Sequence, residues 1–478
     1  MPISISDVSQ EQKHRILELA EGHFADLKAK EIKPASLSHH LSALANADGG
    51  ELFVGIDEDR VTKLRSWRGF NSEEEANAHI QCFDSLFPLG QDFSYDFLRC
   101  KGETGLVLQI SVLKTRDIKV ATDGFPYIRR GASSIVVKSP DGLDRLKLDK
   151  GITTFETATV DADPIEITNS CNTLQFLLEI IPTAEPDIWL RKQQLIRDNK
   201  PVVAGILLFA EEPQALLPKR SAIKVYRYKT KDSVGSRETL DFNPITIEGC
   251  IYDQIKEAVD KTVKVVQDTV LLGAEGFENI QYPDVAIHEI VTNAVLHRDY
   301  SVADDIHVRI FDNRIEVESP GRLPGHITVD NILNERVARN GILVRLINKF
   351  PDPPNKDVGE GLNTAFEAMR KLRLKDPEIT QRENSVVVNI RHESLASAEE
   401  IVMDYMKSHD RINNSIGREI CRIPSENVMK RVFERLIERD MLERIPELKG
   451  KSVAYRKKNS ISPISLDIIE EIDVEISK

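Results

Sequence analysis

Three polar residues spaced four apart, Glu289, Asn293 and His297, are the best candidates for chemistry in this chain. On a helix this spacing puts the three side chains on one face, while Val291 and Val295 supply an apolar side. A carboxylate followed by a carboxamide suits a magnesium-nucleotide site. The carboxylate can polarise a water, and the amide oxygen can complete the shell of a phosphate-bound Mg²⁺. On spacing alone, an amphipathic surface helix explains the pattern equally well.

Glycine-containing turns follow at two further places. A predicted strand over 314–318 runs into Ser319-Pro320-Gly321, and Gly359-Glu360-Gly361 precedes a predicted helix over 364–372. Glycines at a loop-to-helix junction let the backbone approach phosphates at the helix N-terminus. These elements follow the predicted helix that carries Glu289 and Asn293. Their order along the chain indicates a nucleotide site more specifically than any one of them does alone.

A second group of acidic residues lies near the N-terminus. Glu21, Asp26 and Lys28 form the pattern E-x4-D-x-K, and Asp57 ends a predicted strand that follows a Gly-Gly turn. Carboxylates on neighbouring strands could hold a divalent metal, with Lys28 offsetting phosphate charge, as in a phosphodiesterase. Scattered carboxylates are more often ordinary surface groups, so both interpretations stay open.

The C-terminal part is basic within an acidic chain. The net charge is −13, yet residues 405–460 contain 14 Lys/Arg against 8 Asp/Glu. Helices are predicted over 415–423 and 425–439, with Ser425 as an N-cap and a hairpin over 441–458. This order resembles a winged helix, which binds either nucleic acid or protein, and the basic excess favours nucleic acid. The candidate contacts are Asn427, Lys430, Arg431, Lys449 and Lys451.

Length and composition favour a multidomain protein of the cytoplasm. A chain of 478 residues exceeds one compact core, and a content of 41% hydrophobic and 29% charged residues is ordinary for a globular protein. We find no apolar run long enough to cross a bilayer and no signal-peptide pattern, so no membrane partner is expected. The five cysteines lack the paired spacing of a zinc site or disulfide framework.

The motifs of the second half resemble those of the GHKL ATPases. More specifically, they resemble those of bacterial proteins that join an AlbA_2 (Schlafen-like) domain to a divergent GHKL domain and are often labelled transcriptional regulators. The matching stretches are NAVLHRDYS from Asn293, ESPGRLP from Glu318, RNGIL from Arg339 and GEGL from Gly359.

This resemblance implies ATP and Mg²⁺ as cofactors, with Asn293 as the Mg²⁺ ligand and Glu289 as the general base. Arg298 or Arg339 could touch phosphate, or could be a surface arginine. Glu318 replaces the usual adenine-binding aspartate, so slow hydrolysis or simple sensing of ATP is compatible with the site. The implied cofactor-binding residues are Glu289, Asn293, Glu318, Gly321, Gly359 and Gly361.

The N-terminal segment resembles the AlbA_2 domain. In Schlafen relatives, the two acids of the first motif and an aspartate after the Gly-Gly strand form a metal-dependent RNase centre. Carried over, these are Glu21, Asp26 and Asp57, with Mg²⁺ or Mn²⁺, although Asp26 replaces the commoner glutamate. Arg129 and Arg130 lie in the stretch matching the family's "yyR-G-ss" and are candidate phosphate contacts, or ordinary strand-edge arginines.

These patterns predict an α+β multidomain protein with an AlbA_2 α/β domain, a GHKL α/β sandwich of the Bergerat type and a winged helix. The predicted segments are the AlbA_2 domain over 1–152, linking helices and strands over 153–270, the GHKL domain over 271–395, the winged helix-turn-helix over 398–460 and an acidic tail over 461–478.

Alternating apolar patterns predict the elements between the motifs. The N-terminal elements are a helix ending at Asn46, a turn through Gly49-Gly50 and a strand reaching Asp57. The later elements are strands at 202–209 and 222–228, helices over 252–272 and 286–297, and a hairpin of 306–311 with 314–318.

The leading functional hypothesis is an ATP-regulated, metal-dependent nuclease, in anti-phage defence by family analogy. GHKL relatives commonly dimerise with ATP, so at least a dimer is expected. The alternatives are a non-catalytic, ATP-responsive transcription regulator and an ATP-driven oligomeric scaffold. Both RNA and DNA stay open as the polymer.

Overall fold

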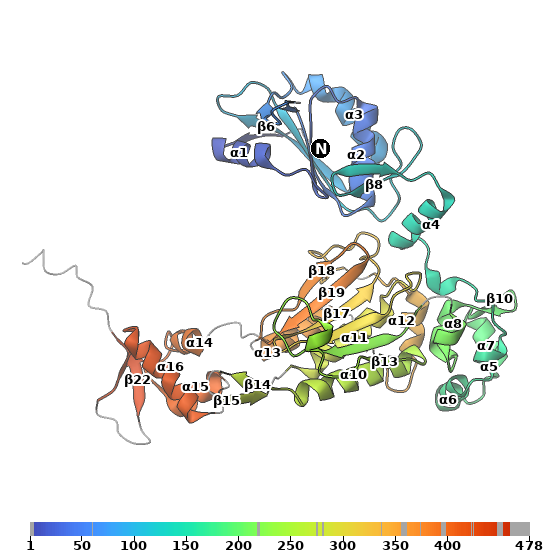
Figure 1. Cartoon of the computed structure of the whole chain (residues 1–478). Coiled ribbons are helices and arrows are strands. Elements are labelled where there is room, and N and C mark those ends of the chain that lie inside the picture. The colour runs from blue at the N-terminus through green and yellow to red at the C-terminus, as the bar shows by residue number, and fades with distance from the viewer. Residues whose placement is uncertain are drawn as a thin grey trace, which may run out of the picture. The chain divides into compact units, whose positions relative to one another are not determined.

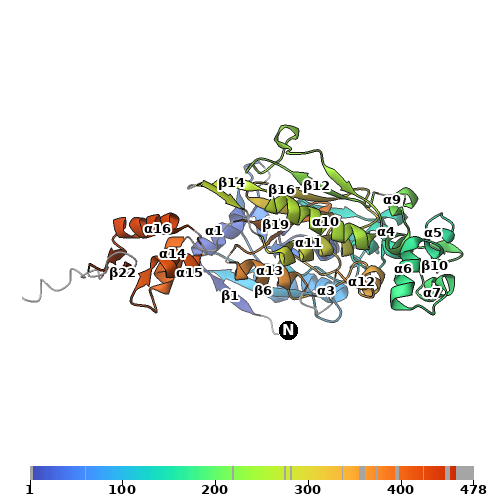
Figure 2. The ribbon, with the colours of Figure 1, turned by 90° about the horizontal axis from the view of Figure 1, so that it is seen from below.

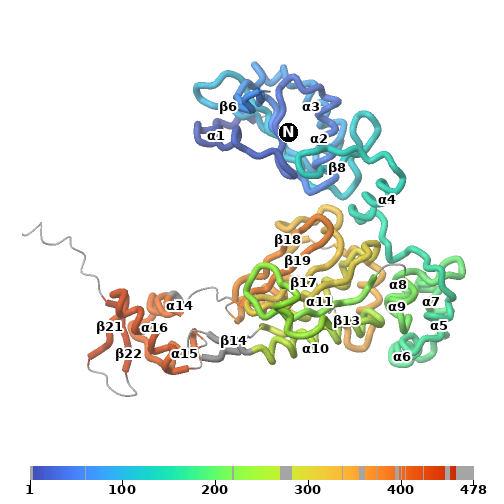
Figure 3. Tube along the Cα trace, in the orientation of Figure 1, coloured from blue at the N-terminus to red at the C-terminus, as the bar shows by residue number. Residues whose placement is uncertain are grey.

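The chain divides into two compact units in a computed structural model. The first comprises Met1–Asp268, Tyr282–Ala368 and Asp376–Arg391, and the second Thr269–Gln281, Met369–Lys375 and His392–Lys478. Residues outside the described part are drawn in grey in Figure 3. The described residues are 4–59, 61–217, 220–273, 276–279, 282–335, 337–354, 361–372, 374–392, 398–421, 423, 425–446 and 453–458.

The first unit begins with a five-stranded mixed sheet in the order β1-β6-β7-β3-β2. Helices α2 and α3 belong to the same domain (Figure 1). Leu37, Leu41 and Leu44 recur at helical spacing on α2 and are fully buried, so α2 contributes a continuous apolar stripe to the core. The elements of this domain are β1 (Ile5–Val8), α1 (Gln10–Glu18), β2 (Ala25–Lys28), α2 (Pro34–Asn46), β3 (Gly50–Val54), β4 (Ile56–Glu58), β5 (Arg65–Trp67), η1 (Glu74–Ala76), α3 (Asn77–Leu86), β6 (Phe93–Cys100), β7 (Val107–Val112), β8 (Tyr127–Arg130), β9 (Ser133–Val136) and α4 (Pro140–Asp149).

The turn between α2 and β3 depends on glycine. Helix α2 ends at Asn46 as predicted, and Gly49 and Gly50 have φ angles of +80° and +146°. A Cβ atom on Gly50 would lie 2.5 Å from the carbonyl oxygen of Phe24. The predicted strand does not continue to Asp57, because β3 ends at Val54 and Asp57 lies in β4, a separate ribbon paired with β5.

A cluster of short helices follows. The predicted strand at 202–209 is wrong, because Val203–Phe209 forms helix α8, all of whose residues are buried. A run that is apolar on every side carries no period that separates helix from strand. The elements here are η2 (Phe155–Thr157), α5 (Ile165–Thr168), α6 (Cys171–Ile180), α7 (Pro186–Lys192), β10 (Ile196–Arg197), β11 (Lys200–Pro201), α8 and α9 (Pro213–Leu216).

The rest of the first unit is built on a six-stranded sheet in the order β13-β12-β16-β17-β19-β18. Helices α10 and α11 lie side by side and contact this sheet (Figures 1 and 2). The predicted hairpin is present as antiparallel β16 and β17. The elements are β12 (Ile223–Arg227), η3 (Arg237–Thr239), β13 (Ile245–Ile247), α10 (Ile251–Gln267), α11 (Asp284–Leu296), β16 (Ile306–Ile310), β17 (Arg314–Pro320), α12 (Gly341–Ile347), α13 (Leu362–Lys371), β18 (Glu378–Gln381) and β19 (Ser385–Arg391).

Two strands of this sheet, β12 and β13, precede residue 270. The predicted boundary between a linker over 153–270 and an ATPase domain over 271–395 therefore cuts through one sheet. The predicted α+β, multidomain class is confirmed. Within the described part of the chain, no helix has both the length and the apolar character needed to cross a bilayer.

The second unit contains the predicted order of three helices and a hairpin. Ser425 caps α16, its side chain accepting a hydrogen bond from the amide of Val428. Met429, Phe433 and Leu436 of α16 are fully buried in the core of this unit. Its elements are β14 (Val270–Gly273), β15 (Gly276–Asn279), α14 (Ala398–Tyr405), β20 (Ile412–Asn413), α15 (Asn414–Cys421), α16 (Glu426–Glu438), β21 (Leu442–Arg444) and β22 (Ala454–Lys457).

Replacing Gly50 with alanine should destabilise the N-terminal domain more than the φ angle alone requires. Gly124 is the matched control, because it also has a positive φ of +84° but a Cβ atom there would meet no other heavy atom within 4 Å. Gly124→Ala should cost about 1 kcal/mol through backbone strain. Gly50→Ala should cost at least about 2 kcal/mol more, because the methyl group meets the carbonyl of Phe24. Calorimetric unfolding of the full chain would measure both, and equal losses would contradict this account.

Candidate functional site

A pocket of about 380 Å³ opens beside α11. Glu289, Asn293 and His297, the residues predicted to share a helix face, all line it. Apolar side chains make up most of the remaining wall, among them Val317 of β17 and Val386 and Val388 of β19. The other lining residues are Ile290, Ala294, Val317, Ser319, Gly321, Arg322, Leu323, Pro324, Ile327, Ile332, Glu335, Val337, Ala338, Val344, Gly361, Leu362, Val386 and Val388.

Glu289 and Asn293 interact directly. The side-chain amide of Asn293 donates a hydrogen bond of 2.7 Å to Oε1 of Glu289. Burial raises the pKa of Glu289, and the hydrogen bond from Asn293 opposes that rise only in part. A carboxyl group with a raised pKa is a stronger base once ionised, as activation of a water requires.

His297 ends the polar face of α11. Burial, and secondarily the positive charge of Arg339, lower the pKa of His297 to about 4. The imidazole is therefore neutral at pH 7 and adds no positive charge to the pocket. The hydroxyl of Ser319 donates to the carbonyl of Ala294 at 2.7 Å, which ties the end of β17 to α11.

Two of the three glycines predicted to bind the cofactor line the pocket. Gly321 lines the pocket with a φ of +106°, and a Cβ atom there would lie 2.4 Å from Cβ of Asp299. Gly361 also lines the pocket, whereas Gly359 lies outside the described residues.

Glu318 does not line the pocket. Its neighbours Val317 and Ser319 do, because side chains alternate between the faces of a strand. The carboxylate of Glu318 instead accepts hydrogen bonds of 2.6 Å from Arg309 and 2.6 Å from Ser385. The predicted cofactor-binding role of Glu318 therefore has no support from its position.

Arg298 and Arg339 are both buried, so the expectation of surface arginines is wrong. Arg298 donates to backbone carbonyls, including that of Asp304. Arg339 donates to the carbonyl of Arg322 and lies 3.4 Å from Asp299. Neither lines the pocket, and both hold neighbouring loops in place.

The sequence-based assignment missed Arg322. This residue lies in the motif ESPGRLP and lines the pocket, but no role was assigned to it. Its position directly after Gly321 was the available signal, because Gly321 was itself predicted to bind the cofactor.

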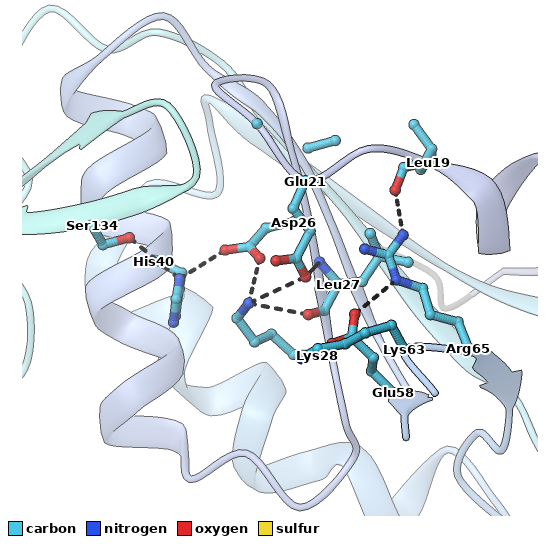
Figure 4. Close-up of polar contacts among 12 residues, drawn as sticks. Leu19, Glu21, Asp26, Leu27, Lys28, His40, Glu58, Lys63, Arg65 and Ser134 are labelled. Atoms are coloured by element: carbon cyan, nitrogen blue, oxygen red, sulfur yellow. Dashed lines mark hydrogen bonds and ion pairs between the residues drawn. The ribbon is translucent and has the colours of Figure 1, made fainter. Parts of the chain in front are cut away.

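The N-terminal cluster centres on Asp26, which is fully buried (Figure 4). Oδ1 of Asp26 pairs with Lys28, and Oδ2 lies 2.9 Å from Nδ1 of His40 and 2.8 Å from Nη1 of Arg129. Burial alone would raise the pKa of Asp26, but the hydrogen bonds from His40 and Lys28 outweigh it and lower the pKa to about 2. Asp26 is therefore ionised and compensated at neutral pH.

Glu21 approaches the same lysine. Its Oε1 lies 3.8 Å from Nζ of Lys28, so the structure brings together the three residues of the E-x4-D-x-K pattern (Figure 4). Asp57 accepts a 2.7 Å hydrogen bond from Arg68, the residue that directly follows β5. Among the described residues, no group of three His, Cys, Asp or Glu side chains is placed to hold a metal ion. Because both oxygens of Asp26 already face cations, this arrangement does not fit a divalent ion.

Arg129 is fully buried, so its predicted phosphate contact is wrong. Its guanidinium donates to the carbonyl of Gly22 at 3.0 Å and 2.8 Å and to Asp26. Residues alternate along β8, so the next residue, Arg130, is exposed. Arg130 remains a candidate contact.

The predicted C-terminal contacts are partly visible. Asn427, Lys430 and Arg431 are exposed on α16, on the side away from its buried residues Met429 and Val432. Lys449 and Lys451 lie outside the described residues. Nucleic-acid binding by this unit stays a prediction.

Asp26→Asn should destabilise the protein in a pH-dependent manner. At pH 7 we expect a loss of about 3 kcal/mol, because Arg129 loses its buried counter-charge. A carboxyl whose folded pKa is depressed stabilises the fold above its unfolded pKa, and this contribution is lost as the pH falls toward 2. The difference between wild type and variant should therefore shrink by about 2 kcal/mol from pH 5 to pH 2.

Denaturant unfolding across this pH range would measure the effect. Asp187→Asn, which removes an exposed carboxylate paired with Arg191, should change little at any pH. A difference between wild type and Asp26→Asn that stays constant with pH would contradict the assigned charge state.

Comparisons with known protein families match two separate segments of the chain. Residues 21–138 match the family described as "Schlafen, AlbA_2", and residues 303–390 match the family described as "Putative ATP-dependent DNA helicase recG C-terminal". The second match begins after α11, so Glu289 and Asn293 lie outside it.

A solved structure of the DIP2311 protein from Corynebacterium diphtheriae shares 17% identity over 94% of this chain and 96% of its own, with a TM-score of 0.39. A search of curated proteins gave no match. The chain combines a Schlafen-type AlbA_2 domain with a divergent ATPase-like domain.

Proposed function

We propose that this protein binds ATP in the pocket beside α11 and uses it to control a nucleic-acid-binding AlbA_2 domain. The observation that carries the proposal is the hydrogen-bonded pair of Glu289 and Asn293 at the wall of a largely apolar pocket. The ATPase-like family match to residues 303–390, which contribute most of the other lining residues, supports the same assignment. The AlbA_2 match supports a nucleic-acid partner.

The donor set of the pocket fits Mg²⁺ bound together with nucleotide phosphates. Mg²⁺ prefers oxygen ligands and is commonly held by one or two protein groups plus phosphate oxygens. The amide nitrogen of Asn293 is committed to Glu289, which leaves its amide oxygen as a ligand. When bound, the ion would neutralise phosphate charge.

Glu289 supplies the base. Its carboxylate would accept a proton from a water that attacks the terminal phosphate, and the hydrogen bond from Asn293 fixes its orientation. Because burial raises the pKa of Glu289, the carboxylate form is lost at a higher pH than for an ordinary glutamate. Hydrolysis should therefore decline on the acid side earlier than an exposed carboxylate would dictate.

Glu289→Gln should keep nucleotide binding and lose hydrolysis. Replacing the carboxylate with an amide removes the base, so the rate should fall by about 10²- to 10⁴-fold. Asn293→Ala should weaken binding of Mg-ATP, because it removes the proposed ligand. Calorimetric ATP titration and phosphate release would separate the two effects. Glu257→Gln, an exposed change on α10, is the control. Unchanged hydrolysis in Glu289→Gln would overturn the assignment.

A nuclease is the second candidate function. The observation that favours it is the convergence of Glu21 and Asp26 on Lys28, as the family pattern predicts. Both carboxylate oxygens of Asp26 are occupied by cationic or hydrogen-bonding side chains, which is incompatible with a preformed metal site, so we derive no metal-dependent step. Anti-phage defence and dimerisation in response to ATP belong to this proposal by family analogy. An operator-binding regulator and an oligomeric scaffold are its rivals.

One experiment distinguishes the nuclease, the regulator and the scaffold. The protein is incubated with transfer RNA, single-stranded RNA and duplex DNA, with Mg²⁺ or Mn²⁺ and with or without ATP. If the protein is a nuclease, cleavage should disappear in Glu21→Gln. Glu21 is about one-third exposed, so the variant should fold. Glu18→Gln, an exposed change on α1, should cleave as the wild type does. Binding without cleavage would favour a regulator, and ATP-dependent assembly without binding would favour a scaffold.

A further inference from the structure

The segment Gly321–Ile327, which follows β17, takes part in two contacts. Several of its residues, including Arg322 and Leu323, line the nucleotide pocket. The same segment is held by the N-terminal half of the first unit. Nζ of Lys114 donates to the carbonyls of Leu323 at 2.8 Å and Ile327 at 3.0 Å. One wall of the pocket is therefore also a contact surface of the AlbA_2 domain.

Arg322 joins the two contacts through one side chain. It lines the pocket, and its guanidinium forms an ion pair with Asp48, which lies in the turn between α2 and β3. Among the described pocket-lining residues, Arg322 is the sole lysine or arginine, alongside the carboxylates of Glu289 and Glu335. Phosphates that enter the pocket would thus meet a cation already shared with a carboxylate.

Asp48 has other partners that can compensate it. Its carboxylate lies 2.7 Å from Nε2 of His23 and 3.3 Å from Nζ of Lys114, and it accepts a 3.1 Å hydrogen bond from Gln381. Although burial opposes them, these groups and Arg322 keep the pKa of Asp48 well below its usual range. Transfer of Arg322 to a phosphate would therefore leave no unpaired buried charge.

The contact extends to the N-terminal cluster through His23. This residue lies in the loop between Glu21 and Asp26, and Arg129 holds the carbonyl of Gly22 in the same loop. A change in the partners of Asp48 would thus alter the interactions of the backbone segment that carries Glu21 and Asp26.

We propose that Arg322 is a nucleotide-responsive ionic switch. Phosphates in the pocket compete with Asp48 for its guanidinium, and nucleotide binding loosens the hold of the pocket wall on the loop that carries Glu21 and Asp26. The proposal rests on the nucleotide binding proposed above, and adds the residue through which the AlbA_2 domain senses occupancy.

The affinity for a fluorescent ATP analogue, measured on the full chain, tests the competition. Asp48→Asn should strengthen binding about tenfold because the rival carboxylate is gone, and Arg322→Gln should weaken it by about the same factor. The matched controls are Asp117→Asn, an exposed carboxylate of the same domain, and Arg382→Gln, an exposed arginine paired with Glu318. Both controls should bind as the wild type does.

Hydrogen exchange tests the switch first on the wild type, for which no variant has to fold, and then on Arg322→Gln. Saturating ATP should speed exchange of amides in 19–28 and 45–52, and Arg322→Gln at saturation should not show this change. If the wild type binds ATP but its amide exchange does not change, or if Asp48→Asn and the wild type bind the analogue with equal affinity, the switch is wrong and the proposed function still stands. Absence of ATP binding by the wild type would overturn the proposed function together with it.

Discussion

The close approach of Gly321 to Asp299 is the constraint on which the candidate site depends. A side chain at residue 321 would collide with Asp299, so only glycine lets the chain leave β17 at this point. The direction of that exit puts Arg322 and Leu323 into the pocket wall and their carbonyls within reach of Arg339 and Lys114. The pocket and the contact with the N-terminal domain thus share one backbone turn.

Buried charged side chains in the first unit are ion-paired or hydrogen-bonded to neighbouring groups. This explains why Arg129, which was predicted to contact phosphate at the surface, lies inside the protein. Arg129 neutralises Asp26 and satisfies backbone carbonyls, a use that requires it to leave the surface. Lys150 donates to the carbonyls of Ala45 and Thr115, each at 2.7 Å, and burial lowers its pKa to about 7. Such groups fix loops by saturating carbonyls that no regular element satisfies.

Features with a strong local pattern could be predicted from the sequence. The spacing of Glu289 and Asn293, the glycine turn after Asn46 and the cap at Ser425 each depend on residues a few positions apart. The pairing of Asp26 with Arg129 could not be predicted in this way, because it joins residues 103 positions apart and depends on how the strands associate. The helix at Val203–Phe209 was missed because complete burial erases the amphipathic period.

The interleaving of the two units along the chain limits how the protein can be dissected. The chain passes between them at 268/269, 281/282, 368/369, 375/376 and 391/392, so the second unit is not a simple C-terminal appendage. A truncation after Arg391 would retain Thr269–Gln281 and Met369–Lys375 without the remainder of their unit. Those segments immediately precede α11 and end α13, which both supply pocket residues. A fragment cut at 391 would therefore keep two short segments whose own unit has largely been removed, so recombinant boundaries should follow the units and not the sequence motifs alone.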